Sequence, residues 1–300
     1  LLWRLDLEKI LAAVGGMVVR FLAYGAIAYL AFIIVSAWRW QVLLDYKRFD
    51  NPFMKTMVIY FIATFFNNLL PTTIGGDVMR IYYSMKGRRT EAVATVLVDR
   101  ILGFVGLFIF ALGAVLYLLV SKNQTEFLPF TLIGLAGIIV VTYVFFSRRA
   151  FNLLSVYIGR ITLFRLGDRL NRIHEATIDF GGAWWTIVVC LLQSILIQGL
   201  LALAPFMVMK GMGIETVGIL PFLVYIPIIN VVSMIPISFN ALGIREYFYI
   251  LLFGRVGLSA ETAVAVSLVS FFLYVVLSLT GFICFIFYRQ KVPDNQKEAS

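Results

Sequence analysis

The sequence of 300 residues is 61% hydrophobic and 14% charged, whereas about 25% of the residues in a typical soluble domain are charged. Runs of about 20 apolar residues recur along it, and each is long enough to cross roughly 30 Å of hydrocarbon. The runs are continuously apolar rather than alternating, which excludes an outer-membrane barrel as well as a soluble domain. The sequence therefore predicts an all-α, polytopic helical membrane protein with a single transmembrane domain over 1–300.

Five segments are predicted to span the membrane completely. They cover residues 18–38, 90–120, 126–146, 183–209 and 260–287. Two further apolar segments, 53–86 and 216–254, are interrupted near their middles by Pro, Gly and Asn. Each is either two short spans or one re-entrant hairpin that enters and leaves on the same face. The opening residues "LLWRLDLEK" could be the tail of a first transmembrane helix that precedes residue 1.

The distribution of positive charge favours the hairpin interpretation. Cytoplasmic segments of helical membrane proteins are enriched in Lys and Arg. If 53–86 opens to the cytoplasm and 216–254 opens outward, most of the 25 Lys and Arg residues fall on the cytoplasmic side, Arg39 among them. Amphipathic rings are favoured at the same interface, which then holds Trp38, Trp40, Trp184 and Trp185. The net charge of +9 thus reflects membrane orientation, and no nucleic-acid partner is expected.

Two stretches that follow the interruptions resemble each other. "GRRTEAVATVLV" (87–98) and "GLSAETAVAVSLV" (257–269) share a glycine and, four residues later, a glutamate before small and β-branched residues. With hairpins of opposite orientation, this match predicts two inverted repeats, about 11–120 and 183–288, each containing a broken re-entrant helical hairpin. Transporters of this architecture bind their substrates at the broken helices.

The predicted halves are joined by the span 126–146 and by a basic segment, 147–182. The segment carries six arginines and an apolar stripe at helical spacing, made by Leu163, Leu166, Leu170 and Ile173. It is predicted to be an amphipathic helix on the cytoplasmic surface, either a connector alone or also a contact for anionic lipid headgroups. His174 is expected to be solvated and to bind no metal. Cys190 and Cys284 lie in apolar runs and are expected to be free thiols.

The first interruption, "LLPTTIGGDVMR" (69–80), has the composition of a binding site inside a membrane. Pro71 is expected to end one half-helix, the following glycine pair to allow a tight turn, and a second half-helix to start near Asp77. The N-terminus of that half-helix would present free N–H groups and the positive end of its dipole toward mid-membrane. Arg80 lies one turn further along the same side.

The second interruption repeats this pattern from the opposite face, with Gly243 followed by Arg245 and Glu246. Two helix N-termini, each with an arginine, would suit an anionic group such as phosphate. Asp99 and Arg100 lie about 13 Å into their span, well past the interface. The candidate substrate-binding and translocation residues are Asn67, Asn68, Pro71, Gly75, Gly76, Asp77, Arg80, Asp99, Arg100, Asn230, Pro236, Asn240, Gly243, Arg245 and Glu246.

Two interpretations of these intramembrane charges stay open. Charges are expensive in hydrocarbon and usually mark a pathway. They could instead form a buried ion network, in which Asp77 pairs with Arg80 and Arg245 pairs with a carboxylate of the other repeat. The sequence contains no GxxxxGK[ST], HExxH, Ser-His-Asp set or CxxC. No catalytic residue, metal or cofactor is therefore expected, and the protein is predicted not to be an enzyme.

Four stretches carry a resemblance to a known family: "RWQVLL" (39–44), "NNLLPTTIGGDVMR" (67–80), "VLVDR" (96–100) and "PISFNALGIRE" (236–246). Through them nearly the whole chain resembles the transmembrane domain of the lysylphosphatidylglycerol synthase/flippase family, which includes stand-alone flippase-like membrane proteins. Bifunctional members carry a soluble aminoacyl-transferase domain after the membrane part, and we expect none here. The resemblance therefore implies lipid translocation or handling rather than lipid synthesis.

The leading hypothesis is an inner-membrane lipid transporter, a flippase that binds a phospholipid or another phosphate-bearing anionic lipid between the two interruptions. A secondary transporter of a small anionic or polar solute, and a non-transporting membrane partner of a lipid-modifying enzyme, are the alternatives. The expected partners are membrane phospholipid and anionic lipid headgroups. A second copy of the chain or a separate soluble transferase are further candidates.

Overall fold

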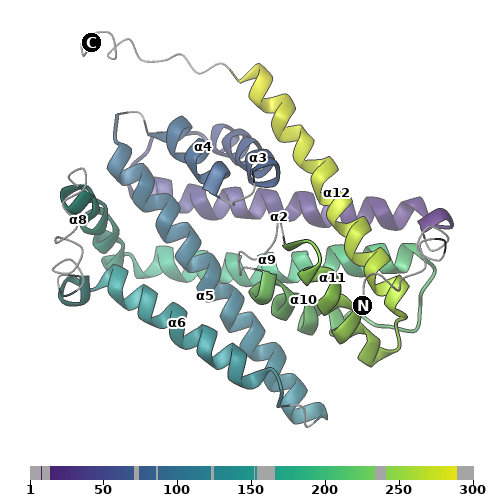
Figure 1. The fold of residues 1–300 in the computed structure, drawn as a ribbon. Helices are drawn as coiled ribbons and strands as arrows, with labels where there is room; N and C mark the ends of the chain where they lie inside the picture. Colours follow the sequence, from purple (N-terminus) through teal and green to yellow (C-terminus); the bar gives the residue numbers. More distant parts are fainter. Residues whose placement is uncertain are drawn as a thin grey trace.

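The computed structural model describes residues 8, 14–70, 74–85, 87–122, 125–151, 153, 166–233 and 241–288. Within these parts of the chain every regular element is a helix and no strand is present. This confirms the all-α class that the continuously apolar runs predict. The long helices cross one another at varied angles instead of standing as one parallel bundle (Figure 1).

Five helices are long and apolar enough to cross a membrane. They are α2 (Val19–Tyr46), α5 (Arg89–Lys122), α6 (Leu128–Phe146), α9 (Trp184–Gly211) and α12 (Ala260–Phe287). The five predicted spans are thereby confirmed, and the chain is a multi-pass membrane protein. The helix α2 continues past its predicted end at residue 38, because Arg39 and Gln41 find hydrogen-bond partners inside the protein.

The helices α2 and α9 lie side by side and antiparallel (Figure 1). The backbone N–H of Val18, just before α2, donates to the carbonyl of Gly211 at the end of α9 over 2.8 Å. At the opposite end, the Tyr46 hydroxyl donates to the carbonyl of Asp179, which precedes α9, over 2.7 Å. Opposite directions of these two helices are what an inverted repeat requires, while the repeat relation itself stays a prediction.

Each interrupted segment contains a pair of shorter helices. These are α3 (Phe53–Leu69) with α4 (Ile74–Ser84), and α10 (Leu220–Ser233) with α11 (Ile244–Phe253). The Arg88 side chain, after α4, donates to the carbonyl of Arg48, ahead of α3. In the second pair the Phe222 and Phe253 rings lie 4.5 Å apart. Each pair therefore starts and finishes on one side of the bundle, as a re-entrant hairpin would, and re-entry stays a prediction.

The helices pack across the two halves of the chain. The helix α12 lies against α3, and α5 lies against α10. The first of these contacts is close because Gly281 has no side chain: a Cβ there would come within 2.0 Å of the Phe61 carbonyl oxygen. Among the described residues, the largest buried apolar cluster joins α5 to α9, α10, α11 and α12. Each half is thus completed by a long helix of the other half.

The glycine pair at the first interruption serves close helix packing, and the predicted tight turn at this pair is wrong. The helix α4 already includes Ile74, about one turn before the predicted start near Asp77, so Gly75 and Gly76 are helical. A Cβ on Gly76 would lie 2.3 Å from the Ala63 carbonyl oxygen of α3. The approach of α4 to α3 therefore leaves no room for a side chain at this position.

Two predicted surface positions are wrong. Trp40 is fully buried, and its indole N–H donates to Thr95 Oγ1 over 3.3 Å. His174, on the helix α8 (Leu166–Ile178), is 3% exposed and stacks on the Phe151 ring with centroids 3.6 Å apart. It is covered because α8 packs against α5 and α6. The other three tryptophans of the predicted interface are exposed: Trp38, Trp184 and Trp185.

Two smaller expectations concern the cysteines and the amphipathic segment. Cys190 and Cys284 are free thiols, as predicted. Part of the basic segment forms the helix α8, as predicted. Leu163 lies outside the described residues, as do the side chains of Leu166 and Leu170. The helix at Leu166–Ile178 is therefore confirmed, whereas the apolar stripe on it stays a prediction.

The close contact of α4 with α3 predicts that Gly76→Ala lowers stability. The added methyl group must push the two helices apart, and overpacking of this kind costs about 1–3 kcal/mol. Thermal unfolding of the purified protein in detergent should show a lower Tm. Gly137→Ala is the matched control, since a Cβ at Gly137 meets nothing within 4 Å. An equal effect of both substitutions would contradict the packing role of Gly76.

The burial of His174 predicts a loss of stability in mild acid. Burial lowers the pKa of His174 below its ordinary value, so the folded protein keeps this ring neutral. The unfolded chain binds a proton near pH 6.5; below that pH the unfolded state holds more protons, and stability falls as the pH falls. The Tm of the wild type should drop more between pH 7.5 and 5.5 than the Tm of His174→Phe. Identical pH dependence in both proteins would refute this.

Candidate functional site

The first interruption is anchored by an asparagine. Asn67, in the last turn of α3, accepts the backbone N–H of Gly76 with Oδ1 over 2.9 Å. This N–H is one of the first in α4, which have no partner inside their own helix. One of the amides expected to face an anion is therefore already bonded within the protein. The next residue, Asn68, is partly buried at the end of the same helix.

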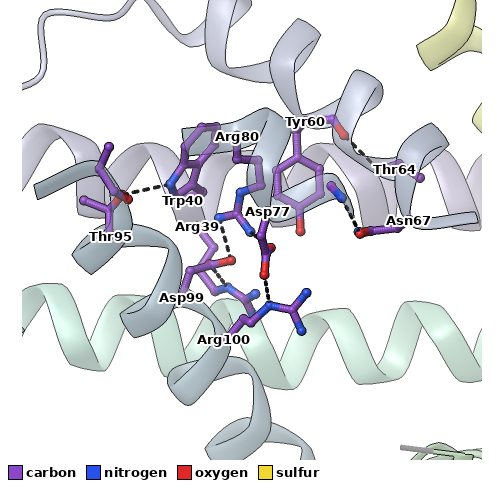
Figure 2. Close-up of polar contacts among 12 residues, drawn as sticks. Arg39, Trp40, Tyr60, Thr64, Asn67, Asp77, Arg80, Thr95, Asp99 and Arg100 are labelled. Carbon is purple, nitrogen blue, oxygen red and sulfur yellow. Dashed lines mark hydrogen bonds and ion pairs between the residues drawn. The ribbon is translucent and has the colours of Figure 1, made fainter. Parts of the chain in front are cut away.

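Asp99 on α5 is the centre of a buried ionic cluster (Figure 2). Its Oδ1 accepts from Arg39 Nε over 2.7 Å, and its Oδ2 accepts from Arg80 Nη2 over 2.8 Å. The exposed fractions of Asp99, Arg39 and Arg80 are 1%, 7% and 4%. Charge-assisted hydrogen bonds of this length are the strong ones in proteins. A single carboxylate thus connects α5 with α2 and α4.

The cluster continues through Asp77 and Arg100. Asp77 lies 3.6 Å from Arg80 Nη1, as the predicted pair at i,i+3. It forms a second ion pair with Arg100 Nε, which reaches it from α5. The four charged residues expected around the first interruption are therefore brought together. Their mutual pairing is the set of contacts that a buried ion network predicts.

Arg39 is a member of the cluster that we expected at the cytoplasmic surface. It is buried instead, and besides Asp99 it contacts α9, where Nη1 donates to Ser194 Oγ over 2.9 Å. The available signal was its place in "RWQVLL", directly before Trp40 in an apolar helix. An arginine buried at such a position requires a counter-charge, which Asp99 supplies.

Two aromatic rings cover Arg80 (Figure 2). Its Cζ lies 4.4 Å from the centroid of the Trp40 ring and 5.0 Å from that of Tyr60. A desolvated arginine over such rings gains about 2 kcal/mol of cation–π attraction. Between the rings and Asp99 the guanidinium is enclosed, and its Nε makes no hydrogen bond to a described residue. In this conformation the ionic cluster is therefore closed to a ligand.

The second interruption is organised by Glu246 from within its own helix. Gly243, with a φ of +88°, precedes α11, and its N–H donates to Glu246 Oε2 over 2.6 Å. Glu246 Oε1 accepts from Arg245 Nη2 over 2.7 Å and from Ser267 Oγ over 2.9 Å. The alternative that pairs Arg245 with a carboxylate of the other repeat is therefore wrong, because the helix cap places Glu246 within reach first.

A cavity of about 200 Å³ lies beside Arg245. Residues of α2, α9, α10, α11 and α12 line it, and Asn230 is another predicted site residue on its wall. Arg80 is not among the described residues that line this cavity. The two arginines thus have different surroundings: one is enclosed in the ionic cluster, and the other is on a cavity wall. The two arginines do not share this cavity, although we expected both of them to line one common cavity.

Three of the predicted site residues lie outside the part of the chain that the structure describes: Pro71, Pro236 and Asn240. Among the described residues, no group of three or more His, Cys, Asp or Glu side chains could hold a metal ion. The described charged side chains at the two interruptions form ion pairs and hydrogen bonds. The described arrangement can bind an anion at Arg245 and can hold helices together at Asp99.

Comparisons with known proteins agree with the fold. The family model described as the lysylphosphatidylglycerol synthase TM region matches residues 1–281. A UPF0104 membrane protein of Pyrococcus horikoshii is 24% identical over 294 residues, covering 89% of this chain and 87% of that protein. Another, of Methanothermobacter thermautotrophicus, is 26% identical over 319 residues, covering 95% and 88% of the two chains. No solved structure gives a significant match.

The ionic cluster predicts a large loss of stability in Asp99→Asn. The amide keeps the size of the carboxylate but removes its charge, so the buried Arg39 loses its counter-ion and the buried Arg80 keeps only Asp77, 3.6 Å away. Breaking a buried pair in this way costs about 3–5 kcal/mol, which thermal or chemical unfolding in detergent would detect.

Glu175→Gln is the control for this prediction. Glu175 also forms an ion pair, with Arg148 Nη2 at 3.0 Å, but both side chains are exposed, by 58% and 67%. Exposed pairs contribute about 1 kcal/mol or less, so this variant should unfold close to the wild type. If Asp99→Asn were as stable as Glu175→Gln, the cluster would not hold the helices together.

Proposed function

Because the chain belongs to the family of lysylphosphatidylglycerol synthase transmembrane regions, we propose that it transports a lipid across a membrane. The proposed activity is that of a flippase for a phospholipid or another phosphate-bearing anionic lipid, in the inner (cytoplasmic) membrane of the cell. The family supports a lipid-related membrane role, and the choice of transport rests on the site.

The observation that carries the proposal is a cavity within a bundle of membrane-spanning helices, with Arg245 on its wall. Polar groups at membrane depth are tolerated where they line a cavity. An arginine there is positioned to bind a phosphate oxygen of a headgroup. The surrounding helices present apolar surface outward, along which the acyl chains of the same lipid can lie.

The ionic cluster at the first interruption would be the closed counterpart of this cavity. For a headgroup to pass, Arg80 must leave Asp99, and the departing guanidinium then needs another oxyanion. A lipid phosphate provides one, so ligand binding can offset the cost of separating the buried pair. Asp77, Arg100 and Glu246 would keep the route polar. Exchange between the arrangement in which Arg80 binds Asp99 and the one in which it binds the phosphate would expose the route to the two sides of the membrane in turn.

One observation keeps a second candidate in view. The cavity volume of about 200 Å³ is below the roughly 300–1,000 Å³ of ordinary small-molecule pockets. It can enclose a headgroup, with the acyl chains outside, or a small anionic solute alone. Transport of such a solute is therefore the second candidate. A non-transporting partner of a lipid-modifying enzyme has no feature of the described residues in its favour beyond the family.

Reconstituted vesicles with a labelled anionic phospholipid test the proposal. The double variant Arg80→Ala, Arg245→Ala should move lipid at least about tenfold more slowly than the wild type, since each lost charge-assisted contact contributes roughly 1.5–3 kcal/mol. Arg148→Ala is the control, because Arg148 makes an exposed ion pair with Glu175 and should leave the rate unchanged.

Equal lipid movement by the wild type and the double variant would overturn the proposal. Uptake of inorganic phosphate or a soluble phosphodiester into the same vesicles is measured in parallel. Solute uptake without lipid movement would establish the second candidate instead. Thermal unfolding of each variant is measured as well, to show whether slower transport comes from unfolded protein.

A further inference from the structure

The cavity beside Arg245 and the ionic cluster at Asp99 lie at two levels of the same pair of helices, α2 and α9. We infer that the cavity and the cluster are the two ends of one route for an anionic group, which runs between these helices and is closed by Tyr60. This inference rests on the proposed function, because it names the path that the transported group takes between its two arginines.

One face of α2 runs from the cavity to the ionic cluster. Tyr29 and Phe32 line the cavity, and Arg39 binds Asp99. Ser36 lies between Phe32 and Arg39, and spacings of three and four residues place these side chains of α2 on one face of the helix. Ser36 is 1% exposed and is not on the cavity wall. On α2, a buried hydroxyl therefore separates the two sites.

The neighbouring helix α9 carries the same pattern in the opposite direction. Its Leu201 and Pro205 line the cavity, and its Ser194 accepts a hydrogen bond from Arg39. Gln198 lies between Leu201 and Ser194 on the same face, three residues from one and four from the other. Because α2 and α9 are antiparallel, the serine of α2 and the glutamine of α9 occupy the same interval between the two sites. We call this pair, Ser36 and Gln198, the polar interval.

The amide of Gln198 lacks a partner while the polar interval is closed. Gln198 is 6% exposed and is not on the cavity wall, and its Oε1 accepts no hydrogen bond from a described residue. A buried acceptor without a donor is unfavourable, and an apolar side chain at this position would avoid that cost. Water or a polar group that enters the interval supplies the missing donor. A glutamine here therefore suits a route that opens.

Tyr60 on α3 connects the polar interval to the ionic cluster. Its ring centroid lies 5.0 Å from Arg80 Cζ (Figure 2), and its hydroxyl shares a hydrogen bond with Ser36. Tyr60 is not on the cavity wall, whereas its electrostatic neighbour Tyr274 is. When Arg80 leaves Asp99, as the proposed function requires, the Tyr60 ring loses its cation–π partner. The hydrogen bond to Ser36 then holds the gate alone, so release of the arginine favours opening of the route.

Labelling of an introduced thiol tests the route in the full chain in lipid vesicles. Gln198→Cys is treated with 2-sulfonatoethyl methanethiosulfonate, an anionic reagent that stays in water, and mass spectrometry distinguishes the labelled residue from Cys190 and Cys284. Gln193→Cys is the matched control. Gln193 is a buried glutamine of the same helix, 5% exposed, and lies about 140° around the helix from Gln198 at 3.6 residues per turn.

The thiol at position 198 should react at least about tenfold faster than the thiol at position 193, because even an open state of about 1% population exposes the first and not the second. Equal rates at the two positions would overturn the inference.

Tyr60→Phe tests the gate. The change keeps the ring on Arg80 and removes the hydroxyl that binds Ser36. In this background the thiol of Gln198→Cys should react about two- to tenfold faster, the effect of one lost hydrogen bond. The thiol of Gln193→Cys should keep its rate. An unchanged or slower reaction at position 198 would refute the gate.

Ser36→Cys is a second reporter, on the other side of the polar interval, should Gln198→Cys not fold. Its control is Ser278→Cys, because Ser278 is also 1% exposed, bonds to its own backbone at Val275 and is not on the cavity wall. The thiol at position 36 should react faster than the thiol at position 278, and equal rates would again overturn the inference.

Labelling and transport test the route and the proposed function separately. If position 198 is labelled selectively but neither lipid nor a soluble phosphodiester moves, the route stands and the proposed transport fails. If lipid moves and the double variant Arg80→Ala, Arg245→Ala is slow, yet position 198 reacts no faster than position 193, the proposed function stands and the route fails.

Discussion

The buried carboxylate of Asp99 is the constraint on which the first half of the bundle depends. A carboxylate enclosed to this degree is tolerated only when opposite charges and hydrogen bonds satisfy both of its oxygens. Arg39 and Arg80 do so from two other helices, so an independent shift of α2, α4 or α5 breaks at least one of these buried ion pairs. The short pair α3–α4 is then fixed twice, by this cluster and by the helix contact at Gly76.

The second half satisfies its buried charge over a much shorter range. Glu246 binds the cap of its own helix, its neighbour Arg245 and one serine of α12. No counter-charge from a distant helix is needed, and the helices around Arg245 leave a cavity. The described side chains enclose Arg80 beside the first interruption, whereas those around Arg245 beside the second leave a cavity. On the proposed function, this asymmetry is what one end state of an alternating-access cycle looks like.

The spans and interruptions could be predicted because apolar length and Pro/Gly content act locally along the chain. The grouping of charges around the first interruption was equally predictable, since charges in hydrocarbon must find one another. Arg39, Trp40 and His174 could not be placed, because a polar or aromatic residue near a helix end suits the interface unless tertiary packing covers it. The separation of Arg80 from Arg245 likewise depends on how the halves pack, which no local pattern encodes.

The exchange of long helices between the halves has a consequence for biosynthesis. The helix α3 leaves the ribosome long before α12, yet the face that receives Gly281 is covered only when α12 arrives. During the interval, lipid or the insertion machinery must shield that face. The first half is therefore not a self-sufficient folding unit. Its assembly in the membrane is completed only after the second half has been translated.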